Sequence, residues 1–140
     1  MCAAGTSRYA PTENAVNSTE VVIAQIQGMK ALLENNNRLF EASMQKAVSL
    51  EEETNYPAGP PRITQPSFEQ YGEWLLAQGN YNSAIEQFDK SLERMPRRFK
   101  SLMGKMKALK ALDKKEAAIL LHDELKSILV NADESVLSLI

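Results

Sequence analysis

Residues 68–96 read FEQYGEWLLAQGNYNSAIEQFDKSLERMP, in which small and large residues alternate at helical spacing. Gly79 divides the stretch into two helical segments, because a glycine at this place ends a helix without steric cost. Small residues let two helices approach closely, and the large ones fill the space between them. The stretch therefore predicts a helical hairpin. Its small and large positions are Tyr71, Gly72, Leu75, Leu76, Gly79, Tyr81, Ala84, Phe88, Leu92 and Pro96.

The composition is that of an ordinary globular protein. The chain has 140 residues, of which 44% are hydrophobic and 24% charged, and this is enough for one domain with its own core. A net charge of −2 gives no global attraction to nucleic acid or to membranes. Cys2 is the single cysteine, which fits a reducing compartment. No signal-like apolar run opens the chain and no run is long enough to span a membrane, so we expect a cytoplasmic protein.

An earlier helical hairpin is predicted at residues 17–53. Asn17 and Glu20 resemble a helix cap with an acidic residue three places on. Residues 35–37 are three asparagines, which favour a turn because their side chains compete for backbone hydrogen bonds. The apolar stripes on the two helices are Val22, Ile26, Met29 and Leu33, followed by Phe40, Met44, Ala47 and Val48.

A proline-rich segment follows this hairpin. Residues 56–66 hold four prolines and one glycine, which exclude a helix. A disordered hinge is one interpretation of residues 54–66. We favour an ordered strap, because Tyr56 and Ile63 supply apolar anchors in it.

The hairpin at residues 68–96 has a second copy 34 residues later. Ser67 with Gln70 and Asp113 with Glu116 are capping-box patterns, which predict the start of a helix in each copy. The match weakens at Tyr71 and Gly72, whose counterparts are Lys105 and Met106, and we expect Gly104 to be the close-contact position of the fifth helix instead. The shift of 34 residues relates Phe68 to Leu102, Gly79 to Asp113, Ala84 to Ala118, Phe88 to His122 and Ser91 to Leu125.

Residues 66–130 resemble two units of the tetratricopeptide repeat (TPR) family, and residues 18–50 resemble a degenerate hairpin of the same kind. Hairpin, strap and terminal pair together are similar to the C-terminal end of longer bacterial TPR proteins. The resemblance implies an all-α fold, a right-handed stack of three antiparallel helical hairpins in an α-α superhelix. The expected organisation is a flexible tail at 1–16 and one TPR-like domain at 17–140, made of a degenerate hairpin (17–53), the strap (54–66), two TPR units (67–130) and a C-terminal cap or tail (131–140).

Catalytic and metal-binding patterns are missing from the sequence. His122 is the only histidine, so a metal site or a Ser/His/Asp triad lacks its usual groups. The glycines form no phosphate-binding loop. We therefore expect a non-catalytic protein that holds no metal and no cofactor. We assign His122 to packing, and for Trp74 we favour packing in the core or strap over a role as an exposed binding anchor.

The TPR resemblance implies a protein-protein interaction scaffold that binds a peptide or protein segment in a concave groove. Two alternatives stay open: a structural capping module of a larger TPR array, and a homo-oligomerising domain with no peptide ligand of its own. Charges of both signs in the groove indicate a partner that carries both charges or one with apolar anchors. The groove candidates are Glu69, Glu73, Leu76 and Ala77 on the third helix, and Lys100, Met103, Lys107 and Lys110 on the fifth.

Residues 94–115 form a basic stretch. Nine lysines and arginines stand against a single acid, Asp113, so the stretch carries +8 and the rest of the chain −10. A surface for an acidic partner is one interpretation, and a solvated outer face is the one we favour. Interleaved aromatic residues, on which bases stack, are nearly absent, which argues against nucleic acid.

Assembly is predicted from the first hairpin. Val21, Val22 and Ile23 form an apolar run that no preceding repeat covers, and exposed patches of this kind usually mark an interface. We expect either a homodimer through the first hairpin or, in a longer protein, packing by another repeat.

Overall fold

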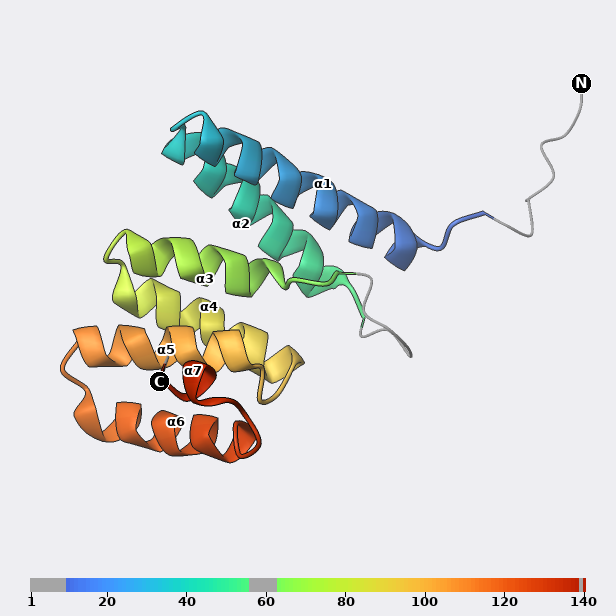
Figure 1. Cartoon of the computed structure of the whole chain (residues 1–140). Coiled ribbons are helices and arrows are strands. Elements are labelled where there is room, and N and C mark those ends of the chain that lie inside the picture. Colours follow the sequence, from blue (N-terminus) through green and yellow to red (C-terminus); the bar gives the residue numbers. More distant parts are fainter. Residues whose placement is uncertain (1–9, 56–62, 139) are drawn as a thin grey trace, which may run out of the picture. The chain divides into compact units, whose positions relative to one another are not determined.

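A computed structural model describes residues 10–55, 63–138 and 140, and every regular element in them is a helix (Figure 1). The all-α prediction is therefore confirmed. Two compact units, Met1–Thr64 and Gln65–Ile140, make up the chain. The described helices include none that is both long and apolar enough to cross a membrane. The helices are α1 (Glu13–Leu33), α2 (Asn37–Glu53), α3 (Ser67–Ala77), α4 (Tyr81–Arg94), α5 (Phe99–Ala111), α6 (Lys115–Ile128) and α7 (Glu134–Leu137).

Parts of three predicted segments lie outside the described residues. These are residues 1–9 of the predicted tail, residues 56–62 of the predicted strap, Tyr56 among them, and residue 139 of the predicted C-terminal cap or tail. Ile63, the other expected anchor, is buried.

In the first unit, α1 and α2 form a hairpin (Figure 1). The large residues predicted for α2 are all buried, as expected. Small residues dominate the buried face of α1, where a Cβ added to Gly28 would lie 3.3 Å from Met44 Sδ and 3.6 Å from Phe40 Cδ2. Gly28 therefore lets the two helices approach closely. The buried residues of α1 are Ser18, Val21, Ala24, Gly28 and Ala31.

The apolar stripe predicted on the first helix lies mostly outward. Ile26 is 63% exposed and Leu33 is 84% exposed. The period indicated a helix correctly, but the large residues do not face α2, because the small residues on the opposite side make that contact.

The predicted helix starts need correction. α1 begins at Glu13 and not near Asn17, because Thr12 caps it: its Oγ1 accepts a hydrogen bond from Ala15 N at 3.2 Å. Pro66, not Ser67, is the cap residue of α3. Asp113 does not cap α6 either, since it belongs to the turn before the cap residue of that helix.

The three hairpin turns share one backbone geometry. Asn35, Gly79 and Asp113 all have positive φ, at 57°, 78° and 57°. The next residue in each case donates its N–H to a carbonyl five positions back, which closes the helix in a Schellman motif. These bonds are Asn36 to Ala31 at 2.8 Å, Asn80 to Leu75 at 2.9 Å and Lys114 to Leu109 at 2.9 Å. The helix ends predicted at Gly79 and at the asparagines are confirmed.

In the second unit, α3 packs on α4, α4 on α5 and α5 on α6, and α3 also contacts α5 (Figure 1). Phe88 on α4 is fully buried. A Cβ added to Gly72 on α3 would lie 2.9 Å from Phe88 Cε1, and one added to Gly104 on α5 would lie 2.3 Å from Phe88 Cζ. Gly104 is thus a close-contact position, as predicted, and its neighbour is an aromatic ring on α4.

The C-terminal end covers the core between α5 and α6. α7 supplies the turn expected in the tail, and Ile140 packs against this core, whereas Leu137 stays 41% exposed. Buried at the centre are Leu102, Met106, Leu109, Ala118 and Leu125.

We expect Gly104→Ala to lower the free energy of unfolding by about 1–3 kcal/mol, because the added methyl group overlaps the ring of Phe88. Gly28→Ala is the matched control: its methyl group meets the flexible end of Met44, and the gain in helix propensity offsets part of that contact. Urea unfolding of both variants measures the difference. Equal effects would show that Phe88 yields readily to the new methyl group.

Candidate partner-binding surface on α3 and α5

A buried polar network joins three helices of the second unit. The Glu69 carboxylate on α3 is fully buried and accepts two hydrogen bonds from Arg98, from Nε at 2.6 Å and from Nη2 at 3.0 Å. Ser101 Oγ on α5 donates to Glu69 Oε2 at 2.8 Å. Ser91 Oγ on α4 lies 2.8 Å from Ser101 Oγ and is the donor of that pair, since the Ser101 proton is already used.

This network decides the role of one predicted groove residue. A carboxylate held by a two-pronged arginine and a serine is satisfied inside the protein. The Arg98 side chain is 27% exposed while that of Glu69 is not exposed at all. Glu69 therefore holds α3 against the start of α5 and presents no free charge to a ligand.

Glu73 lies one helical turn after Glu69 and remains accessible. Its carboxylate is 3.9 Å from Lys100 Nζ and accepts a hydrogen bond of 3.4 Å from Gln65 Nε2. Partial burial raises the pKa of Glu73 above its ordinary value of 4.5, and the nearby Glu69 raises it further, whereas Lys100, Arg98 and the Gln65 bond lower it. The structure thus brings two predicted groove residues, Glu73 and Lys100, into one ion pair.

The other predicted groove residues differ in accessibility. Leu76 on α3 and Met103 on α5 are half-buried, and Met103 packs against the core between α5 and α6. Ala77, Lys107 and Lys110 are exposed. The surface accordingly combines partly buried apolar groups with exposed cations.

Much of the basic stretch is used inside the second unit. Besides Arg98 and Lys100, Lys105 pairs with Asp89 on α4. Arg97 Nη2 donates a hydrogen bond to Ser127 Oγ at 3.0 Å. The Arg94 guanidinium lies over the Phe68 ring, 6.0 Å from its centre.

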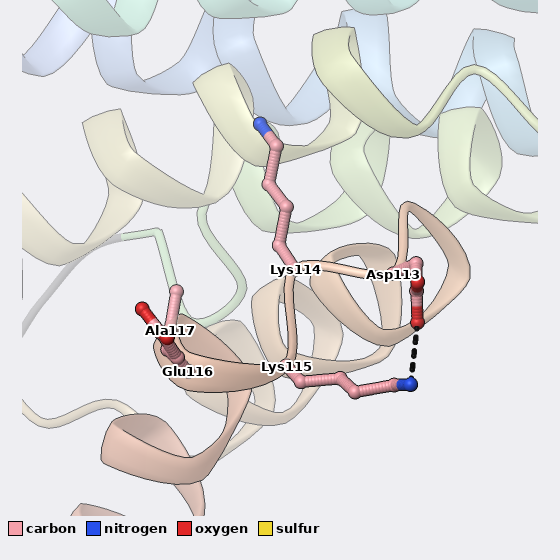
Figure 2. A pocket seen from close by; sticks show the side chains of 5 residues that line it. All are labelled: Asp113, Lys114, Lys115, Glu116 and Ala117. Atoms are coloured by element: carbon pink, nitrogen blue, oxygen red, sulfur yellow. Dashed lines mark ion pairs between the residues drawn. The ribbon is translucent and has the colours of Figure 1, made fainter.

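Three lysines of the stretch remain available: Lys107, Lys110 and Lys114. They are exposed, and the described part of the chain places no acidic group within 4.0 Å of their amines. Figure 2 shows the turn between α5 and α6. Residues 113–117, in this turn and at the start of α6, line a pocket of about 380 Å³. There Lys115 pairs with Asp113 at 3.2 Å, while the Lys114 side chain points away from that pair (Figure 2).

Trp74 and His122 were the two side chains with open roles. Trp74 is half-buried and stacks on Tyr71, with ring centres 6.1 Å apart. His122 is half-buried on α6, where it lines a shallow cavity of about 350 Å³ together with Lys110 and Ile140. Both side chains are therefore partly packed and partly accessible.

A scan against protein-family models found no match, and searches of the curated proteins and of the solved structures found none either. Within residues 10–55, 63–138 and 140, no cluster of three or more His, Cys, Asp or Glu side chains is placed to hold a metal ion.

Arg98 and Ser101 were missed as partners of Glu69. In the sequence, Arg98 was noted only as part of the basic stretch, and Ser101 lies in the fifth helix without any distinguishing pattern. The available signal was the position of Glu69 between the large residues Phe68 and Tyr71, because a carboxylate buried beside them requires a cation from another helix.

We expect Arg98→Ala to lower the free energy of unfolding by about 3–5 kcal/mol, because it leaves the buried Glu69 carboxylate without its counter-ion. Adding Glu69→Gln should recover part of this loss, since an amide costs less to bury than a charge. Lys107→Ala serves as the exposed control and should change stability by less than about 0.5 kcal/mol. Chemical unfolding of the three variants decides whether the buried charge is responsible: if Glu69→Gln recovers nothing, it is not.

A second expectation concerns pH. Since folding raises the pKa of Glu73, its contribution to stability is greatest below the ordinary value of 4.5 and is lost as the pH rises through the folded-state value. Glu73→Gln should therefore gain in melting temperature relative to the unchanged protein between about pH 4 and about pH 7. If the melting temperature of Glu73→Gln instead falls relative to the unchanged protein as the pH rises, the attraction between Glu73 and Lys100 outweighs the cost of burying the carboxylate.

Proposed function

We propose that the second unit is a TPR-like, non-catalytic scaffold whose α3/α5 surface binds a segment of another protein. Three observations support this. Gly79 and Asp113, 34 residues apart, have the same turn geometry. The α3–α5 contact places the first helices of two successive hairpins side by side, which is how a stack of repeats builds a continuous binding surface. Glycines at 72 and 104 let α3 and α5 each pack closely on Phe88 of α4.

The first hairpin and the strap at residues 54–66 belong, in this proposal, to the same kind of stack. Gly28 and Met44 lie seven residues before and nine residues after Asn35, and Gly72 and Phe88 stand in the same relation to Gly79. Both pairs are close contacts between the two helices of one hairpin. The shared spacing supports a common origin of the two hairpin geometries.

The partner that fits the surface best is an acidic protein segment. The observation that carries this is the pair Lys107 and Lys110, which lie three residues apart on one face of α5, with Lys114 exposed in the turn that follows the helix. The acids predicted for the groove do not balance these lysines, because Glu69 is paired with Arg98 and Glu73 with Lys100. The half-buried Leu76 and Met103 offer apolar contacts beside the charge.

A second candidate function is a structural cap for a larger helical array. The packing of Ile140 against the core between α5 and α6 favours it, since a cap shields the last apolar face of a stack. A cap without a ligand predicts that no peptide binds the α3/α5 surface, so the experiment below separates the two functions. A cytoplasmic setting in a bacterium remains the expectation from sequence for either one.

The test uses three synthetic peptides of about fifteen residues that share two leucines and carry acidic, basic or neutral side chains elsewhere. The acidic peptide should bind most tightly, and its affinity should fall with added salt. Lys107→Glu should weaken binding at least about tenfold, which is about 1.4 kcal/mol.

Lys126→Glu is the matched control, because it makes the same charge change at an exposed site on α6, which is not one of the helices of the proposed surface. Fluorescence anisotropy measures all affinities. An equal loss in both variants, or equal binding of the three peptides, would mean that overall charge rather than this surface governs the interaction.

A further inference from the structure

The outer face of α1 carries a seven-residue pattern that the fold of the first unit does not use. Its a and d positions are Val16, Thr19, Ile23, Ile26, Lys30 and Leu33. The four apolar members are exposed, at 42%, 49%, 63% and 84% in chain order. The face that packs on α2 consists of other residues, so α1 has a second apolar face of about 26 Å in length.

The spacing of this face is symmetric. Val16, Ile23, Ile26 and Leu33 are separated by seven, three and seven residues, and this order reads the same in both directions. We propose that α1 pairs in antiparallel orientation with α1 of a second copy of this chain. A two-fold axis between residues 24 and 25 then places Ile23 opposite Ile26 of the second copy and Val16 opposite Leu33.

The polar positions select this orientation. In a parallel pair Lys30 would lie opposite Lys30 of the second copy, and like charges at one layer repel. In the antiparallel pair Lys30 lies opposite Thr19 of the second copy, next to its Glu20. Thr19 of one copy and Lys30 of the other thus form a polar layer, of the kind that fixes the register of paired helices.

The flanking positions agree with the same orientation. Val22 and Met29 line one side of the stripe, and Glu20 and Gln27 line the other. Antiparallel pairing brings each side against its own kind, so apolar meets apolar and polar meets polar. Glu13 and Glu34 of the second copy are the one like-charge pair at these positions. Both are exposed at the ends of the helix, where solvent screens them.

A second copy of this chain is therefore the occupant that the face fits, because the face is complementary to itself. The proposed dimer does not depend on binding at the α3/α5 surface. It has a consequence for that binding, however, because a dimer carries two such surfaces and a partner with two acidic segments then gains avidity.

Sedimentation equilibrium of the full chain tests the association, and we expect a concentration-dependent dimer. Ile23→Asp should raise the dimer dissociation constant at least about 100-fold, because each interface would bury two carboxylates among apolar groups. Leu120→Asp on α6, 72% exposed, is the control and should leave the dimer intact. A monomer at about 100 μM, or equal effects of both variants, would overturn the proposal. Circular dichroism confirms that each variant keeps its helices.

Cysteine crosslinking tests the orientation in a Cys2→Ser background. Chains with Thr19→Cys mixed with chains with Lys30→Cys should form a mixed disulfide dimer under mild oxidation, since these positions face each other only in the antiparallel pair. Each variant alone should form little disulfide dimer, because its own cysteines lie roughly 16 Å apart along the axis. Crosslinking of Thr19→Cys with itself but not with Lys30→Cys would show a parallel pair and overturn the proposal.

Discussion

The ring of Phe88 is the constraint on which the second unit depends. It lies between two helices that could not carry a side chain at that level, since a Cβ on Gly72 or Gly104 would come within 2.9 Å or 2.3 Å of the ring. The ring thus sets how closely α3 and α5 approach α4, and α3 and α5 contact each other as a result. Overlap of this kind cannot be relieved by small shifts, because packed interiors leave little free volume.

The buried network of Glu69 follows from that approach. Ser91 stands one helical turn after Phe88 on α4, and its hydroxyl reaches Ser101 on α5, which in turn donates to Glu69 on α3. A buried ion pair adds little net stability, because desolvation offsets the attraction, but a misaligned pair leaves a charge without a partner. The network therefore penalises any slip between the three helices more than it rewards the native alignment. Close packing and polar pairing act together here, one setting the distance and the other the register.

Helices and turns followed from the sequence, whereas their faces and caps did not. The asparagines at 35–37, Gly79 and the contact at Gly104 were predictable, because positive φ and close approach restrict which residues fit. The outward face of α1 was not, since a periodic stripe marks a helix without saying which side meets its neighbour. Large residues were expected inside, yet Ala24, Gly28 and Ala31 make the contact with α2. The cap positions of α3 and α6 were not predictable from capping-box patterns, because the cap residues Pro66 and Lys114 make no side-chain hydrogen bond to the helix.

Glu69 was predicted to lie in the groove, but it is buried. The cause of its burial is electrostatic and lies at the start of α5. α5 begins at Phe99, with Arg98 as its cap residue and Lys100 in its first turn. It has no acidic residue in that turn and no side-chain cap. Cations at that end oppose the helix dipole, so negative charge from a neighbouring helix is favourable there. Glu69 and Glu73 of α3 supply it. Glu69 and Glu73, which were predicted to face a ligand, thus stabilise the start of α5. Lys107 and Lys110, unpaired among the described residues, lie toward the C-terminal end of α5, where the helix dipole favours positive charge. A net charge of +8 over residues 94–115 consequently overstates what a partner can contact, because pairs within the second unit already use much of it.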